Sequence, residues 1–299
     1  MKRNGLLMLN IIVTSKPSDG LFFYSCEHYF KLKDLGIPVQ LLVFTSGKPG
    51  TESGFAPEQY LKSVEKKYTQ SIPIIFNDYF PGPNDVNLIM GRSMLTLGYK
   101  NRNEHGDDRL FTMHLVFKCK LISVYSENHP KEYDEAVEYF NPEVIIDLCD
   151  YDVYPNGVGN HFEKYIHFDY YIPPVDDVQF EHMFLGTTPE YYEWAKKVVY
   201  KYPDYGIIGY CPPSYVDWSL NNVRAPVENL LGKFNKYDYV KQTFDPAPRL
   251  LQECQHYGKE IIFDRPDIHD GGSVYKRRGL KTPDVSEIVK AYDKLQRMG

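Results

Sequence analysis

Short apolar runs alternate along this chain with segments of helical pattern, and this alternation constrains the fold more than any other feature. In the first half the apolar runs predict strands, several of them continuously apolar, as in a parallel sheet covered on both faces. These strands are Leu6–Val13, Val39–Phe44, Ile72–Phe76, Val86–Met90, Leu121–Tyr125 and Val144–Leu148. The helices predicted between them are Tyr24–Leu35, Pro57–Lys67, Leu110–Cys119 and Pro130–Phe140. The βαβα order predicts an open α/β sheet.

The second half repeats this pattern after a proline-stiffened segment. A strand predicted at Tyr165–Phe168 leads into residues 172–177, IPPVDD, which we interpret as a domain crossover. Further strands are predicted at Gly206–Tyr210, Tyr237–Lys241 and Glu260–Phe263, and helices at Pro189–Val199, Pro226–Leu231, Pro248–Tyr257 and Asp284–Met298. A chain of 299 residues can form two domains of about 150 residues each.

Charge, cysteine content and hydropathy restrict the class of protein. Lys and Arg number 34 against 40 Asp and Glu, and the net charge of −6 argues against a protein that coats nucleic acid by charge alone. A local basic patch remains compatible with this charge. The 5 cysteines are scattered without CxxC spacing, which is typical of reduced thiols in a cytoplasmic protein. No apolar stretch is long enough to span a membrane, so a soluble protein is expected.

The segment with the strongest indication of chemistry is FDPAPRLLQECQHYGKEIIF, residues 244–263. Pro248 can open a helix in which Arg249 and Glu253 lie four residues apart on one face. A helix N-terminus favours a phosphate, and a carboxylate one turn further can accept hydrogen bonds from vicinal hydroxyls. Phosphate plus diol is the profile of a nucleotide sugar. The same residues would also fit an ordinary amphipathic helix with an Arg249–Glu253 salt bridge.

Asp245-x7-Glu253, followed by Gly258 and the predicted strand Glu260–Phe263, resembles the Glu-x7-Glu signature of retaining glycosyltransferases with the GT-B fold. In that family the first acid contacts the donor sugar and the second binds the ribose, which implies these roles for Asp245 and Glu253. The first acid here is Asp, one methylene shorter than the family's Glu. The resemblance implies an α/β protein of two Rossmann-like domains facing a central cleft.

The resemblance also implies a division of labour between the domains. Residues 1–175 would form the acceptor domain and residues 176–283 the nucleotide-sugar donor domain, while helix 284–299 would pack back on the first domain. Cations near the donor diphosphate would come from Arg249, Lys241 and Arg224. The donor would be a UDP-sugar, and no further cofactor is expected.

The run YVKQTFDPAPRLLQECQHYGKEII is similar to glycosyltransferases of tailed bacteriophages that decorate hydroxymethylated cytosines in DNA, within residues 222–275. This similarity implies 5-hydroxymethylcytosine in phage DNA as the acceptor and the host cytoplasm as the location. Lys276, Arg277 and Arg278 follow a double glycine and could contact backbone phosphates of DNA. Such a run of cations is also typical of a solvated loop.

Two further loops are candidates for the site. The loop after the first strand contains Asp19 and Gly20: Gly20 could admit donor phosphates to the backbone, and Asp19 could act as base for the acceptor hydroxyl. It could also be a plain turn between strand and helix. Asp150 and Asp152 form an Asp-x-Asp, the metal-binding signature of the GT-A class.

Several alternatives stay open at the level of the sequence. One is a glycosyltransferase acting on a glycan or small molecule, including a metal-dependent GT-A enzyme. Another is a non-catalytic module that binds a nucleotide sugar. The absence of GxGxxG and GxxxxGK[ST] argues against a Rossmann dehydrogenase and a P-loop kinase.

Overall fold

The computed structural model divides the chain into two compact units, which we call unit 1 and unit 2. Unit 1 comprises residues 1–170 and 281–299, and unit 2 comprises residues 171–280. The structure describes residues 7–13, 16–17, 20–44, 55–77, 82, 85–90, 99, 120–125, 130–147, 167–186, 201–202, 204–209, 222–223, 230–239, 249–266 and 285–298. Within these residues, no helix combines the length and the apolar character needed to cross a membrane.

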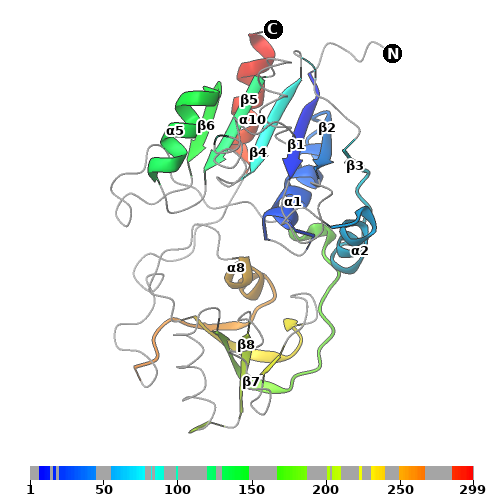
Figure 1. Ribbon diagram of the computed structural model, residues 1–299. Helices are drawn as coiled ribbons and strands as arrows, with labels where there is room; N and C mark the ends of the chain where they lie inside the picture. Colours follow the sequence, from blue (N-terminus) through cyan, green and yellow to red (C-terminus); the bar gives the residue numbers. More distant parts are fainter. Residues whose placement is uncertain are drawn as a thin grey trace. The chain divides into compact units, whose positions relative to one another are not determined.

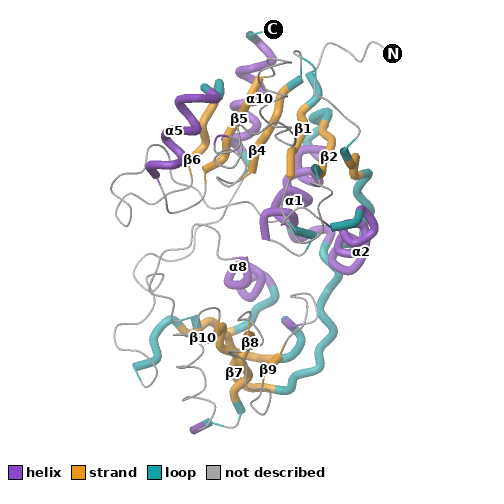
Figure 2. The backbone as a smooth tube through the Cα atoms, viewed as in Figure 1, coloured by secondary structure: helices purple, strands orange, loops and turns teal. Residues whose placement is uncertain are grey.

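Unit 1 is built on a parallel sheet of six strands (Figures 1 and 2). The strands are β1 (Leu9–Val13), β2 (Val39–Val43), β3 (Ile74–Phe76), β4 (Val86–Met90), β5 (Lys120–Tyr125) and β6 (Val144–Asp147). Their order across the sheet is β3-β2-β1-β4-β5-β6, so the chain starts in the middle, builds one side and then the other. This is the strand order of a Rossmann fold, and its topological switch point lies between β1 and β4.

The helices described in unit 1 are α1 (Gly20–Asp34), α2 (Pro57–Lys67), α5 (Pro130–Phe140) and α10 (Ser286–Arg297). Helix α1 packs against β1 and β2, whereas the last helix, α10, packs against β5 and β6. Two side chains fasten α10 to the sheet. The Tyr292 hydroxyl donates to the Leu7 carbonyl at 2.5 Å, and Lys120 Nζ donates to the Leu295 carbonyl at 2.9 Å. The C-terminal helix therefore belongs to unit 1.

One face of the unit 1 sheet carries an apolar row and, next to it, a polar row. The apolar row combines Ile12, Leu42, Ile89 and Leu121 with Ala136 and Phe140 of α5. The polar row lies two residues before Leu42, Ile12 and Ile89 on β2, β1 and β4, and therefore on the same face of the sheet. In this row Gln40 donates to Asn10 at 2.6 Å, and Asn10 donates to Asn87 at 3.0 Å. We call these three residues the amide ladder. It joins β2, β1 and β4 without any net charge.

Unit 2 contains a second parallel sheet, of five strands (Figure 2). The strands are β7 (Phe180–Gly186), β8 (Tyr205–Gly209), β9 (Asn222–Val223), β10 (Phe234–Asp238) and β11 (Glu260–Ile262). The order β11-β10-β7-β8-β9 again places the first strand in the centre, so this sheet is also Rossmann-like. A 3₁₀ turn, η1 (Phe168–Tyr170), ends the first stretch of unit 1, and α8 (Arg249–His256) connects β10 with β11.

Helices α1 and α8 end in the same way. Gly36 and Gly258 have φ of 76° and 67°, in the left-handed region that favours glycine. After α1, Gly36 N donates to Lys33 O and Ile37 N donates to Leu32 O. After α8, Gly258 and Lys259 make the same two bonds, to Gln255 O and Cys254 O. This pair of bonds is a Schellman motif, which satisfies carbonyls that the helix end would leave open.

The predicted α/β architecture of two Rossmann-like domains is confirmed, but some predicted strands of the second half are wrong. Phe168, predicted as the last residue of a strand, is instead the first residue of a 3₁₀ turn. Strand β10 spans Phe234–Asp238 and so begins three residues before the strand predicted at Tyr237–Lys241. The central strand β7 was not predicted, because FEHMFLG carries Glu181 and His182 and so lacks a continuous apolar run. The helices predicted at 110–119 and 189–199 lie outside the described residues.

Candidate functional site: a buried triangle on helix α8

The strand order of unit 2 indicates at which edge of its sheet a ligand would be expected to bind. The chain builds outward from β7 to β8 and β9, and then returns to the other side of β7 with β10. In such sheets, ligands bind outside the carboxyl ends of the strands where the order reverses, here between β7 and β10. Helix α8 follows β10 and connects it with the parallel strand β11, so α8 begins on the carboxyl side of the sheet. Its first residue is Arg249.

Three side chains of unit 2 form a closed triangle at the start of α8. Arg249 Nε lies 2.9 Å from Glu253 Oε1, an ion pair between residues four apart on the helix. The Tyr171 hydroxyl donates to the same Oε1 at 3.2 Å, and a terminal nitrogen of Arg249 donates to the Tyr171 hydroxyl. The Arg249 guanidinium also lies over the Tyr171 ring, 5.8 Å from its centroid. We refer to Tyr171, Arg249 and Glu253 as the α8 triangle.

The triangle is removed from solvent. Glu253 is fully buried, and the side chain of Arg249 is 11% exposed. An ionised carboxylate is costly to bury unless a cation and hydrogen bonds compensate it, and the triangle supplies both. A buried carboxylate at the head of a helix can also exchange partners with an arriving diol and diphosphate, because hydroxyls and phosphate oxygens satisfy the same two side chains.

The charge of Glu253 affects its neighbours on α8. Burial, with the charge of Glu253 as the second cause, raises the pKa of Tyr257 to about 12. Burial and then Glu253 also raise the pKa of the Cys254 thiol well above its usual value, against a smaller opposite effect of Lys259. Both groups therefore stay protonated at neutral pH.

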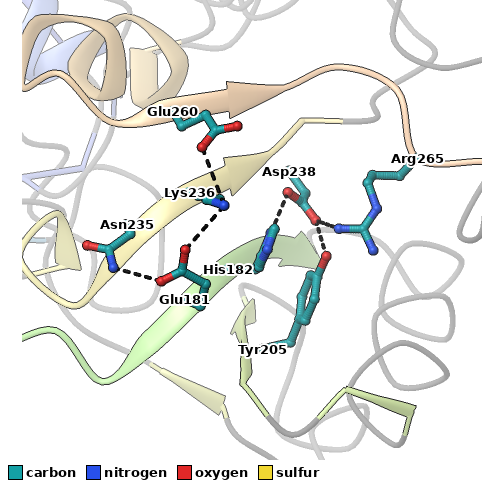
Figure 3. A network of polar contacts seen from close by, with 8 residues as sticks. All are labelled: Glu181, His182, Tyr205, Asn235, Lys236, Asp238, Glu260 and Arg265. Atoms are coloured by element: carbon teal, nitrogen blue, oxygen red, sulfur yellow. Dashed lines mark hydrogen bonds and ion pairs between the residues drawn. The ribbon is translucent and has the colours of Figure 1, made fainter.

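A second buried cluster lies across three strands of the same unit (Figure 3). Asp238, the last residue of β10, has a fully buried side chain that accepts from Tyr205 at 2.6 Å and from Arg265 at 2.7 Å. His182 Nδ1 lies 3.1 Å from the other carboxylate oxygen, and because a carboxylate only accepts, Nδ1 carries the proton. The imidazole stacks on the Tyr205 ring with 4.6 Å between centroids. We call these four residues the Asp238 cluster.

Charged side chains nearer the surface continue this polar region. Lys236 pairs with Glu181 at 3.3 Å and with Glu260 at 3.5 Å, while Asn235 donates to Glu181 at 2.8 Å (Figure 3). The hydrogen bonds from Asn235 and Lys236 lower the pKa of Glu181. The hydrogen bond to Glu181 and the charge of Glu260 raise the pKa of Lys236. This network links β7, β10 and β11.

The structure brings two of the predicted donor residues, Arg249 and Glu253, into direct contact. Gly20 is the first residue of α1, which follows β1 at the switch point of unit 1. Among the described residues, a Cβ placed on Gly20 would meet the Tyr24 ring at 4.0 Å, an ordinary van der Waals contact. The remaining predicted site residues lie outside the described residues: Asp19, Asp150, Asp152, Arg224, Lys241, Asp245, Lys276, Arg277 and Arg278.

Several polar residues of unit 2 were not foreseen from the sequence. Tyr171 is one of many tyrosines in the chain and is 82 residues away from Glu253, so no local spacing marks it. His182, Asp238 and Arg265 are also distant from one another in sequence. The one available signal was an Asp at the end of the strand FNKYD, in a position where a buried strand ordinarily carries an apolar residue.

Metal ligation and disulfide formation receive no support from the described parts of the chain. Among these residues, no group of three His, Cys, Asp or Glu side chains is arranged to hold a metal ion. Cys26 and Cys254 are both buried, and neither forms a disulfide within the part of the chain that the structure describes.

Comparisons with known proteins give similar structures but no similar sequence. No protein-family model matches the chain, and no curated protein matches it in sequence. The glycosyltransferase SnogD from Streptomyces nogalater is similar over 98% of this chain and 94% of its own, with a TM-score of 0.44 and 8% identity. The glycosyltransferase SsfS6 from Streptomyces sp. SF2575, complexed with thymidine diphosphate, is similar over 78% and 76%, with a TM-score of 0.39 and 10% identity.

A putative UDP-N-acetylglucosamine 2-epimerase from Listeria monocytogenes is similar over 97% of this chain and 88% of its own, with a TM-score of 0.41 and 11% identity. At TM-scores and identities this low, the three proteins carry no conclusion about activity. The assignment of two Rossmann-like units rests on the strand orders of the sheets.

Proposed function

We propose that this protein is a glycosyltransferase that moves a sugar from a UDP-sugar to a hydroxyl group of an acceptor. The observation that carries the proposal is the buried carboxylate of Glu253 paired with Arg249 at the start of α8. This helix begins beside the switch point of a Rossmann-like sheet, where nucleotides bind in such folds. A ribose diol can bind to the carboxylate, and a diphosphate can bind to the guanidinium and the helix N-terminus.

In this proposal unit 2 binds the donor and unit 1 provides the acceptor side, as in GT-B enzymes. Asp245 would stabilise the positive charge that builds at the anomeric carbon, and Lys241 and Arg224 would add cations for the diphosphate. Asp19 would take the proton of the acceptor hydroxyl, and Gly20 would admit the donor phosphates to the start of α1. Apart from Gly20, these residues lie outside the described part of the chain, and their roles follow from the motif resemblance.

The proposed acceptor is 5-hydroxymethylcytosine in phage DNA. The support is the resemblance of residues 222–275 to phage glycosyltransferases, together with the cations Lys276, Arg277 and Arg278 after a double glycine. A protein with a net charge of −6 would need such a local patch to hold DNA.

The proposal is tested by measuring UDP release from a panel of UDP-sugars, with and without hydroxymethylcytosine DNA. We expect release from at least one UDP-sugar that depends on the modified DNA. UDP release that requires a glycan or a small molecule instead of DNA would support the glycosyltransferase activity and contradict the DNA acceptor. UDP binding without release under any condition would indicate a binding module. Activity that disappears with EDTA and returns with Mn²⁺ would favour metal ligation by Asp150 and Asp152.

The role of Glu253 is tested separately by calorimetry with UDP. Glu253→Gln removes the charged acceptor, and a hydrogen bond to a charged group is typically worth about 1.5–3 kcal/mol, so affinity should fall about tenfold to a hundredfold. The matched control is Glu260→Gln, which removes an exposed carboxylate of the same unit that pairs with Lys236. UDP affinity should be unchanged in the control. Unchanged affinity in a folded Glu253→Gln protein would remove the ribose assignment.

A further inference from the structure

Tyr171 is the member of the α8 triangle that no sequence motif indicates. It is the first residue of unit 2, it is buried, and it reaches α8 from a segment 78 residues before Arg249. Its hydroxyl donates to Glu253 Oε1 and accepts from Arg249, so one oxygen atom orients both side chains. A phenol can make these two bonds at once because its oxygen is both donor and acceptor.

The triangle has a consequence for the binding of a nucleotide. Glu253 Oε1 is shared by Arg249 and Tyr171. If Arg249 turns toward a diphosphate, the carboxylate loses one of these partners, and a buried side chain that has lost a partner is poorly oriented. The Tyr171 hydroxyl does not depend on Arg249 for its bond to Oε1, and it would therefore hold the carboxylate in place while the guanidinium changes partner.

We propose that Tyr171 is a positioning residue that holds the Glu253 carboxylate in the orientation needed to bind the two hydroxyls of a ribose. The site is thereby selective for ribonucleotides over 2′-deoxyribonucleotides. The inference rests on the proposed function, since it assumes that Glu253 faces the nucleotide sugar. A carboxylate discriminates a diol from a single hydroxyl only when both of its oxygens are held in register with the two donors. Removing the phenolic hydroxyl should therefore reduce discrimination as well as affinity.

The test compares the affinities of UDP and 2′-deoxy-UDP by calorimetry in the wild type and in Tyr171→Phe. The Phe variant keeps the ring under Arg249 and removes only the hydroxyl. We expect the wild type to bind UDP more tightly than 2′-deoxy-UDP. In Tyr171→Phe, UDP affinity should fall about tenfold while 2′-deoxy-UDP affinity changes less. The ratio of UDP affinity to 2′-deoxy-UDP affinity should therefore move toward one. A loss of folding alone would lower both affinities by the same factor.

The matched control is Tyr205→Phe. It also removes a hydrogen bond from a tyrosine to a buried carboxylate of unit 2, in this case Asp238, but it lies outside the α8 triangle. The ratio of the two affinities should stay at the wild-type value in this control. Thermal melting of both variants shows that the folded state is retained.

The outcomes separate this inference from the proposed function. The first case is that the wild type binds UDP, Glu253→Gln weakens this binding, and Tyr171→Phe leaves the ratio of UDP to 2′-deoxy-UDP affinity unchanged. Tyr171 is then not a positioning residue, but the proposed donor site is supported. An equal change of the ratio in Tyr205→Phe would also overturn the inference, because the effect would then not be specific to the triangle. A wild-type protein that binds neither nucleotide overturns both the inference and the proposed function.

Discussion

Units 1 and 2 share a strand order and a way of ending helices, yet they place different polar groups inside their sheets. In unit 1 the interior polar group is the amide ladder of Gln40, Asn10 and Asn87, which carries no charge. In unit 2 it is the Asp238 cluster, in which a buried carboxylate is bonded to a guanidinium, an imidazole and a phenol. The backbone topology is therefore compatible with either kind of interior.

The difference matters for stability. A buried amide that loses its partner costs the desolvation of a neutral group, about 1–3 kcal/mol. A buried charge that loses its partner costs about 3–5 kcal/mol, because the remaining charge stays in a medium of low polarity. Unit 2 should accordingly be more sensitive to single substitutions in its sheet than unit 1.

Two buried cysteines allow the units to be compared within one molecule. Cys26 lies on α1 of unit 1 and Cys254 on α8 of unit 2, and both side chains are buried. The raised pKa of Cys254 keeps it a thiol, and a thiol reacts far more slowly than a thiolate. Alkylation followed by peptide mass spectrometry during a urea titration therefore reports the opening of each unit separately.

The largest expected effect follows from Asp238→Asn. The substitution keeps the shape of the side chain but removes the charge that compensates Arg265, so unit 2 should lose about 3 kcal/mol of unfolding free energy. Labelling of Cys254 should move to lower urea concentration, while labelling of Cys26 should not. If both cysteines shift together, the units unfold as one and the comparison between them does not hold.

A smaller effect, in the other unit, is expected from Asn10→Leu. This substitution removes the central member of the amide ladder and leaves Gln40 and Asn87 without their partner, at a cost of about 2 kcal/mol. Cys26 should now be labelled at lower urea concentration and Cys254 at an unchanged one. A loss as large as that of Asp238→Asn would show that charge is not what distinguishes the two interiors.

Equal effects in the two units are expected from Gly36→Ala and Gly258→Ala. Both glycines end a helix with positive φ, and a Cβ at either position would meet no atom of the described residues within 4 Å, so we expect the backbone conformation to oppose alanine. Each substitution should cost about 1 kcal/mol, measured at Cys26 for Gly36 and at Cys254 for Gly258. Unequal costs would mean that the cysteines do not report the two units on the same scale.

The smallest effect is expected from Glu181→Gln, and it should depend on pH. The folded pKa of Glu181 is lowered, so its contribution is present above its unfolded value and lost as pH falls through the folded pKa. The folded pKa of Lys236 is raised, so its contribution is present at neutral pH and lost as pH rises through the folded pKa.

The variant should therefore melt slightly below the wild type at neutral pH, and the two should converge in strong acid. The reduction in melting temperature caused by Asn10→Leu should instead be the same at both pH values, because no member of the amide ladder titrates. A difference between Glu181→Gln and the wild type that persists in strong acid would show that packing, and not charge, is responsible.

The comparison of the units also explains where prediction from the sequence succeeded. In unit 1 the strands β1, β2, β4 and β6 are short runs of mostly apolar residues, and they were located to within a few residues. In unit 2 the central strand β7 was missed and β10 was shifted, since both carry charged residues in their interiors. An apolar run marks a strand when the residues on both of its faces are mostly apolar, and the part-exposed Glu181 and Lys236 interrupt such a run in β7 and β10.

The candidate site shows the same limit at the level of side chains. The proximity of Arg249 and Glu253 follows from a spacing of four residues on a helix, which the sequence contains. Their roles, and those of Asp245 and the cations around it, remain predictions. The contribution of Tyr171 could not be predicted, because no regular period connects residues 171 and 253.

The sequence by itself determined the alternation of strands and helices, the open α/β class of the fold and the helical pair Arg249–Glu253, since all of these depend on local periodicity. Only the tertiary structure decided that β7 occupies the centre of the second sheet. It also decided that Tyr171 completes the α8 triangle and that Asp238 meets His182, Tyr205 and Arg265. The physical reason is that a buried polar group must be satisfied by whichever partner the folded chain brings within hydrogen-bonding distance, at any separation in sequence.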